Sequence, residues 1–452
     1  MKIMTKKTPR RMAVEILNRI EEHGAFAESL LDALLSHDIH INIQDRRLIT
    51  NVVYGTLRMR GRLDWIIEHL YRGNFLSMNT GIKNILRTGL FQVLFTERIP
   101  DFAIVNEAVE ITKKMHPTGS GLVNAILRNA IRTKDKIAYP EMEKDHILHI
   151  SIVHSHPLWL VKKWTDILGV EETAALCRAN NEIPPTTVRV NALKASREKT
   201  MEELSKLGFD VKATSFSPDG LIISNPPMPL RETACYATGI IQTQDEASQL
   251  IAHLADPKPG ESILDICAGV GGKAAHFAAL MNNHGGITAL DINEKKIESL
   301  KNNVQRLGVT IVNAGVGDAG KDLGKTFYER FDKILVDAPC SGLGTLRRNP
   351  EIKWRLLPED VKNYSTLQNA MLDNAVFYLR KGGLLIYSTC TIAPEENEEV
   401  IKSFINRHPD FTCISPPETI HRCFVDNRGY FRSYPHRHGT DGFFGAALVK
   451  RS

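Results

Sequence analysis

The stretch Ser262–Lys273 reads SILDICAGVGGK and joins a short apolar run to a glycine-rich turn. A short apolar run bounded by turn residues predicts a buried strand, and the glycines permit a tight turn into a following helix. Toward the C-terminus, further apolar runs alternate with helix-like segments such as 293–308 and 359–383. This alternation predicts a doubly wound, mostly parallel sheet of the Rossmann-like α/β class over residues 239–452.

The chain before this sheet has two other patterns. Over residues 1–140, apolar residues recur at three- to four-residue spacing, and Gly, Pro and Asn separate the segments, which predicts an all-α bundle. Residues 141–238 begin with a helical connector and continue with short strands around one helix. We therefore expect three domains: a helical bundle (1–140), a small α/β connecting domain (141–238) and the larger α/β domain (239–452).

Charge is unevenly distributed over the chain. The net charge is +5, but residues 1–140 hold 21 Lys and Arg against 14 Asp and Glu, a net +7, which leaves −2 for the rest. A basic N-terminal domain on a nearly neutral body suggests a polyanion such as RNA as partner. The alternative is a solvated helical surface with surplus lysines.

The seven cysteines include no CxxC pair, and their number is odd. This pattern predicts neither a disulfide framework nor a zinc site, and we expect no metal. No apolar run reaches the roughly 18 residues that span a bilayer, and the basic N-terminus lacks the apolar core of a signal peptide. We expect a cytoplasmic monomer with no membrane partner.

Acidic residues at successive strand ends indicate a cofactor site. Asp291 ends the second predicted strand, 20 residues after Gly271, where a carboxylate can accept hydrogen bonds from a ribose. Asp318 follows the third strand and could accept from an adenine amino group. The G-x-G-x-x-G spacing of dinucleotide folds is absent, and each aspartate alone could be a helix cap or turn residue. The candidate cofactor residues are Cys267, Ala268, Gly269, Val270, Gly271, Gly272, Lys273, Asp291, Asp318 and Asp337.

Two cysteines follow the next two strands. Cys340 lies in DAPCSGLGT and Cys390 in YSTCT. Adjacent strands of a doubly wound sheet would place both thiols at one edge, beside Asp337 and the cofactor loop. A single cysteine at a strand end is more often a small core residue. If both are catalytic, the residues alone leave open which thiol attacks.

The motifs around Cys340 and Cys390 resemble the paired proline–cysteine and threonine–cysteine motifs of RNA cytosine-C5 methyltransferases. CAGVGGK (267–273) is similar to the cofactor loop of that family, and HGTDGFFGAALVK (438–450) to its last strand. Residues 1–140 resemble the helical RNA-binding domain of the NusB antitermination factor. Together these features resemble the bacterial small-subunit (16S) rRNA cytosine-C5 methyltransferase family that includes RsmB, also called Sun or Fmu.

This resemblance implies S-adenosylmethionine as cofactor and methylation of a cytosine at C5 in 16S rRNA through a covalent cysteine–C6 adduct. It implies that Cys390 is the nucleophile, that Cys340 acts as base in product release, and that Asp337 lines the cofactor site. The chemistry of the adduct also makes Asp337 the candidate acidic partner that stabilises the cytosine. The cofactor loop departs from the family, which usually has alanine and proline where this chain has Gly269 and Val270.

Several alternatives remain open from the sequence. The chain could methylate another RNA such as tRNA, act on nitrogen or oxygen atoms, or be a non-catalytic RNA-binding or assembly factor. For RNA contact, Arg347 and Arg348 are the preferred candidates because they follow Cys340 in the same predicted loop. The alternative for this pair is a solvated surface.

Overall fold

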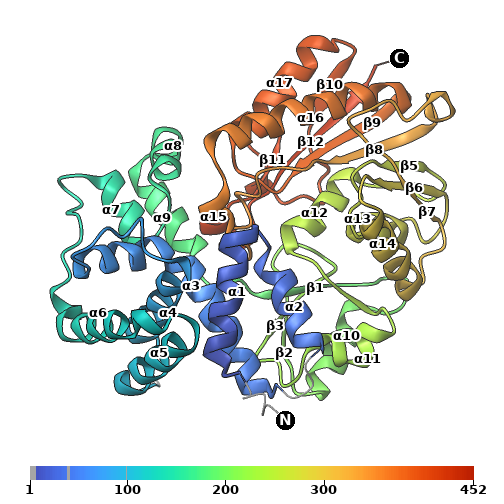
Figure 1. Cartoon of the computed structure of the whole chain (residues 1–452). Coiled ribbons are helices and arrows are strands. Elements are labelled where there is room, and N and C mark those ends of the chain that lie inside the picture. Colours follow the sequence, from blue (N-terminus) through green and yellow to red (C-terminus); the bar gives the residue numbers. More distant parts are fainter. Residues whose placement is uncertain (1–6, 38–40, 98, 452) are drawn as a thin grey trace. The chain divides into compact units, whose positions relative to one another are not determined.

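The computed structural model describes residues 7–37, 41–97 and 99–451. Contacts divide the chain into two compact units (Figure 1). The helical unit comprises the chain up to Glu182 together with Leu346–Arg355, and the α/β unit comprises Ile183–Thr345 and the chain from Leu356 onward. The chain thus leaves the α/β unit after Thr345 and returns to it at Leu356. Within the described residues, no helix is both long and apolar enough to cross a membrane.

The helical unit has the amphipathic segments that the spacing of apolar residues predicts. Polar side chains cap several of its helices: Thr8 accepts from the Arg11 N–H, and Asn42 from the Asp45 N–H. Apolar faces of these helices are buried in two adjoining clusters. The helices are α1 (Pro9–His23), α2 (Ala27–His37), α3 (Ile43–Leu70), α4 (Thr80–Phe95), α5 (Asp101–Met115), α6 (Ser120–Thr133), α7 (His146–Val153), α8 (Leu158–Leu168), α9 (Val170–Asn180) and α15 (Ile352–Arg355).

The segment Leu346–Arg355 is held in the helical unit by a buried lysine. Lys353 is 1% exposed, and its Nζ donates to the carbonyls of Arg58 and Ser155, both at 2.8 Å, and to Asn181 Oδ1 at 3.0 Å. The neighbouring Trp354 donates its indole N–H to the Leu57 carbonyl at 2.7 Å. This attachment of a segment that follows Cys340 in sequence was not predicted.

The smaller sheet of the α/β unit is antiparallel throughout, with strand order β2-β3-β1-β4. The last strand lies past the predicted boundary at 238, yet it pairs with β1 and completes this sheet. The domain boundaries at 140 and 238 stay predictions. The elements are β1 (Thr186–Val190), α10 (Arg197–Lys206), β2 (Asp210–Ala213), β3 (Gly220–Ser224), α11 (Ala234–Ala237) and β4 (Ile241–Thr243).

The larger sheet has the order β10-β12-β9-β8-β5-β6-β7, and β11 pairs with β12. Strands β9, β8, β5, β6 and β7 are parallel, whereas β10 and β12 run antiparallel to their neighbours. The strands are β5 (Ser262–Asp265), β6 (Gly286–Asp291), β7 (Val312–Val316), β8 (Phe331–Asp337), β9 (Leu379–Thr389), β10 (Phe411–Ile414), β11 (Phe431–Arg432) and β12 (Phe444–Lys450).

Helices cover both faces of this sheet. Ile263, Leu335 and Ile386 point to a core shared with α12, α13 and α14, and the alternate residues Leu264 and Ile334 point to a second core shared with α16 and α17. This arrangement confirms the predicted doubly wound fold. The helices are α12 (Glu246–Ala255), α13 (Gly272–Leu280), α14 (Glu294–Leu307), α16 (Pro358–Tyr378), α17 (Glu398–Arg407) and α18 (Pro435–His438).

The register of the parallel strands aligns their carboxyl ends. Asp337 at the end of β8 pairs with Ser388 of β9, and Asp291 at the end of β6 pairs with Val316 of β7. Ligands of open α/β sheets bind at this edge.

Candidate active site

The glycine-rich turn connects β5 to α13. Gly269 and Gly271 both have positive φ angles, of +56° and +83°. A Cβ on Gly271 would also lie 2.7 Å from Leu300 Cγ, so glycine is required there for conformation and for space. The Gly271 N–H donates to the Ala268 carbonyl at 2.9 Å and closes the turn.

The aspartates predicted for the cofactor lie at the expected strand ends. Asp291 Oδ2 accepts from the Gly269 N–H at 3.0 Å, which holds this carboxylate against the glycine turn. Its Oδ1 accepts from the Asn293 N–H at 2.8 Å. Asp291 therefore also stabilises a turn, which was the alternative interpretation of this aspartate from the sequence. Asp318 is half-buried, and its ion pair with Lys321 at 3.0 Å lowers its pKa.

Asp265, the last residue of β5, was not among the predicted site residues. It is 1% exposed; its Oδ1 accepts from the Cys267 N–H at 3.4 Å, and its Oδ2 has no partner within the described part of the chain. Burial, with a smaller contribution from the Asp337 charge, raises the pKa of Asp265 to about 7. The signal in the sequence was its position, immediately before the glycine turn. A buried carboxylate oxygen without a donor indicates room for a ligand that supplies one.

Lys273 and Asp337 form a half-buried ion pair next to this turn. Lys273 Nζ donates to Asp337 Oδ2 at 2.7 Å, and Ser388 Oγ donates to Asp337 Oδ1 at 2.7 Å. Burial opposes the charge on Lys273, but the Asp337 carboxylate outweighs burial and raises the lysine pKa. The site therefore contains a protonated lysine at neutral pH.

The two cysteines meet at the ends of β8 and β9. Cys340 Sγ and Cys390 Sγ are 3.3 Å apart, and both cysteines are free thiols. The hydrogen bond to Cys390, reinforced by burial, raises the pKa of Cys340 well above its usual value. Cys340 is therefore protonated at neutral pH, and either sulfur can donate in this contact.

A buried glutamate that the sequence did not single out joins the two cysteine loops. Glu396 is fully buried and accepts from the Ser341 N–H at 2.8 Å, from Gln368 Nε2 at 3.1 Å and from the Ser341 hydroxyl. Ser341 Oγ also lies 2.8 Å from Thr391 Oγ1. Ser341 follows Cys340 and Thr391 follows Cys390, so one carboxylate fixes the residues next to both thiols.

A third loop contacts these two through the backbone. The Gly344 N–H donates to the Cys390 carbonyl at 3.0 Å, and the Gly442 N–H donates to the Gly344 carbonyl at 2.8 Å. A Cβ on Gly344 would lie 1.9 Å from the Gly442 carbonyl oxygen, so this close approach requires glycine. The DGFF motif is thereby attached to the cysteine pair.

The remaining predicted residues have more ordinary surroundings. Cys267 is a half-buried thiol whose Sγ lies 3.9 Å from Met371 Sδ, and Val270 is 46% exposed. Arg347 is 3% exposed and lies in the segment that belongs to the helical unit, where its carbonyl accepts from Arg58. Little of its guanidinium is accessible to a phosphate, so the predicted RNA contact stays a prediction in which half-buried Arg348 is the more accessible residue.

Comparisons with protein families match three successive parts of the chain. Residues 7–132 match the NusB family, 156–230 match the ferredoxin-like domain of RsmF/B-like methyltransferases, and 252–449 match the 16S rRNA methyltransferase RsmB/F family. The first region lies in the helical unit, the second spans α8, α9 and the smaller sheet up to β3, and the third contains the larger sheet. The fold and the site therefore define the class of this protein, the S-adenosylmethionine-dependent methyltransferases. A helical domain precedes the methyltransferase domain in the sequence.

Full-length relatives narrow this class. The probable ribosomal RNA small subunit methyltransferase B of Bacillus subtilis is 37% identical over 459 residues, covering 99% of this chain and 100% of that protein. The crystal structure of PH0851 superimposes with a TM-score of 0.83 at 30% identity and covers 98% of this chain and 99% of that one. The structure of NSun6 from Pyrococcus horikoshii with SFG gives a TM-score of 0.60 at 25% identity, over 66% of this chain and 100% of that one. The chain belongs to the RsmB/F family of 16S rRNA methyltransferases.

The residues at the sheet edge fit the cofactor of this class, S-adenosylmethionine. The Asp265 Oδ2 has no donor in the described chain, the space around a Cβ on Gly269 or Gly272 is open to 4 Å, and Asp291 presents a carboxylate beside the turn. Asp265 and Asp291 would bind groups that carry hydrogen-bond donors, and the open glycines would allow the ligand to approach the backbone.

Proposed function

We propose that this chain methylates C5 of a cytosine in 16S rRNA and that Cys390 attacks C6 of the base. The observation that carries the proposal is the pair of thiols, 3.3 Å apart at adjacent strand ends beside the cofactor turn. A methyltransferase acting on nitrogen or oxygen has no need of two cysteines at this position.

The chemistry gives each thiol a task. Cytosine C5 is a poor nucleophile, but a thiolate that adds to C6 moves electron density onto C5. S-adenosylmethionine supplies the methyl group. The C5 proton must then be removed by a base, and the C5–C6 double bond re-forms as the cysteine leaves C6.

The electrostatics of the pair support the division of roles. Because Cys340 stays protonated at neutral pH, its S–H can donate to a Cys390 sulfur that has lost its proton. The protonated Lys273 nearby favours a thiolate at this site. Once Cys390 is bonded to C6, its negative charge is gone, and the Cys340 pKa should fall. Cys340 can then lose its proton to solvent and accept the C5 proton. Asp337 is proposed to bind the 4-amino side of the cytosine.

The substrate is proposed to be RNA because the chain belongs to a family of rRNA methyltransferases and carries a basic NusB-family domain. A base must leave its stack to reach a thiol at a sheet edge, so a cytosine in a loop or single strand is favoured. We further propose that the protein acts as a monomer in the cytoplasm.

The test is mass spectrometry of RNA methylated with isotope-labelled cofactor, with 16S rRNA and tRNA as parallel substrates. The expected product is 5-methylcytosine in 16S rRNA, lost in Cys390→Ala and retained in the control Cys423→Ala, which changes an exposed thiol. Methylation of a ring nitrogen, or a normal rate in Cys390→Ala, would contradict the proposal.

A further inference from the structure

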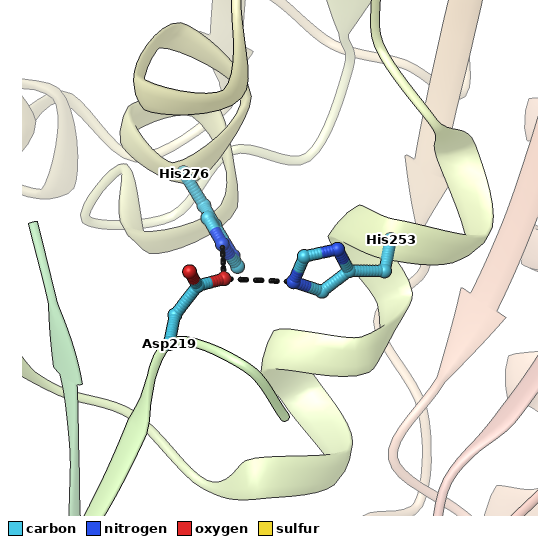
Figure 2. Close-up of side chains that lie close together, drawn as sticks. All are labelled: Asp219, His253 and His276. Carbon is cyan, nitrogen blue, oxygen red and sulfur yellow. Dashed lines mark hydrogen bonds and ion pairs between the residues drawn. The ribbon is translucent and has the colours of Figure 1, made fainter. Parts of the chain in front are cut away.

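Three side chains in the α/β unit converge on one point outside the cysteine site. Asp219 precedes β3, His253 lies on α12 and His276 on α13, and Figure 2 shows both imidazoles directed at the same carboxylate oxygen. His253 Nε2 lies 2.7 Å and His276 Nε2 3.0 Å from Asp219 Oδ2. The side chains are 18%, 11% and 2% exposed, so the cluster is largely shielded from solvent.

The Nε2 atoms of both histidines face the Asp219 carboxylate. With a single proton on each Nε2, both rings can donate to Asp219. A metal ion bound at Nε2 would take the place of these two protons, and each ring would then carry its proton on Nδ1. A neutral imidazole is the form that binds metals.

The candidate ligand atoms lie within 4.8 Å of one another, and the separation of the two rings matches that of a tetrahedral metal site. Two histidines bound through Nε2 to one zinc ion at about 2.0–2.1 Å would have ring centres about 5.2 Å apart, and their ligand atoms about 3.3 Å apart. The two rings here are 5.3 Å apart between centroids. The observed oxygen–nitrogen distances of 2.7 and 3.0 Å require only a small outward shift of the carboxylate.

The backbone holds the carboxylate in this position. The Asp219 carbonyl accepts from the Val190 N–H of β1 at 2.7 Å, and the Asp219 N–H donates to Ser217 Oγ at 3.3 Å. Two imidazoles and one carboxylate are the ligand set of many zinc sites that keep a fourth position for water.

We propose that Asp219, His253 and His276 bind a divalent transition metal ion, preferentially Zn²⁺, which links the β2–β3 turn to helices α12 and α13. Helix α13 begins at Gly272, in the cofactor turn, and Arg189 donates to the Gly272 carbonyl at 2.8 Å. The ion would therefore brace the helix that carries Lys273. The Arg189 charge opposes a second cation, so the site binds less tightly than a structural zinc site. The proposal does not depend on the reaction proposed above.

Calorimetric titration of the chelator-treated full chain with Zn²⁺ tests this site. The paired thiols could bind Zn²⁺ too, so the parent protein for the test is the Cys340→Ser, Cys390→Ser variant. His253→Gln retains a nitrogen that can donate to Asp219 but removes the metal ligand. It should weaken Zn²⁺ binding by at least about 10- to 100-fold, the range seen when even an outer partner of a metal ligand is lost. His284→Gln, at an exposed histidine, should leave the titration unchanged.

Thermal unfolding gives a second readout. Zn²⁺ should raise the melting temperature of the parent and of His284→Gln, but not of His253→Gln, because an ion that binds only the native state stabilises it. Asp219→Asn replaces His253→Gln if circular dichroism shows that the latter misfolds. Equal Zn²⁺ titrations of the parent and a folded ligand variant, or no binding to the parent, would reduce the cluster to a hydrogen-bonded contact and overturn the proposal.

Discussion

Glu396 is a single residue that fixes the positions of both cysteine loops, because its carboxylate binds Ser341 while Ser341 contacts Thr391. Glu396→Gln keeps the size of the side chain but replaces one acceptor oxygen with a donor that faces Ser341 or Gln368. The loss of about one to two buried hydrogen bonds should lower kcat by roughly 10- to 100-fold, with an unchanged KM for the cofactor.

Steady-state kinetics of Glu396→Gln beside Glu399→Gln, which changes an exposed glutamate on α17, provide the measurement. Equal kcat values for the two variants would show that the Glu396 carboxylate does not position the thiols.

Asp265 should make the stability of the ligand-free protein depend on pH. Its pKa is about 7 in the native state and near 4 when unfolded, so the native state binds more protons between these values. The contribution of Asp265 to the free energy of unfolding should therefore fall as pH rises from about 4 to 7, by up to about 1.4 kcal/mol per pH unit. Urea unfolding at several pH values should show Asp265→Asn gaining stability relative to the natural chain across this window. A constant difference between the two proteins would rule out the raised pKa.

At the scale of elements, the conformation of the turn between β5 and α13 depends more on Gly271 than on the neighbouring Gly272. Gly271→Ala places a Cβ at a φ of +83° and 2.7 Å from Leu300 Cγ. Such strain and overlap should destabilise the ligand-free α/β unit by about 1–3 kcal/mol. Gly272→Ala, at the first position of α13 with open space around its Cβ, should have little effect. Thermal unfolding compares the two, and equal melting temperatures would contradict this account of the turn.

The elements show which parts of the fold were predictable. Strands β5, β6, β8 and β9 were predicted because each is a local run of buried apolar residues that ends in a polar motif. Strand β4 was missed because three residues carry no periodicity, and its pairing with β1 is a long-range contact. The predicted helix 359–383 ends instead at Tyr378, because the chain from Leu379 pairs with β8.

At the scale of the whole molecule, the attachment of the segment Leu346–Arg355 to the helical unit depends on Lys353. Lys353→Met removes the donor from the carbonyls of Arg58 and Ser155 and from Asn181, and leaves those acceptors buried. The helical unit should lose about 2–4 kcal/mol of stability. Lys362→Met, at an exposed lysine of α16, is the matched control. Urea unfolding followed by tryptophan fluorescence measures the free energy of unfolding of both variants. Equal values would show that Lys353 does not hold the segment Leu346–Arg355 in the helical unit.

Local sequence motifs predicted some of the site residues, whereas residues whose roles depend on long-range contacts were missed. Cys340, Cys390, Asp291 and the cofactor turn were predicted because each follows a strand in a compact motif, and the sheet brings strand ends together. Glu396 and the Asp219 cluster could not be predicted, since their roles come from contacts between residues 34 to 57 apart that no spacing reveals. The roles of the two cysteines come from the family resemblance and stay a proposal, because either sulfur can donate in their contact.

The division of labour between the two thiols is the central claim, and trapping of the covalent adduct tests it most directly. Cys340→Ala should still form the bond between Cys390 and C6 but release the product slowly, so a protein–RNA species that survives denaturing electrophoresis should accumulate with cofactor and 16S rRNA. The double variant Cys340→Ala, Cys390→Ala should form none. Accumulation in Cys390→Ala instead, or in neither single variant, would contradict the assignment of Cys390 as nucleophile and Cys340 as base.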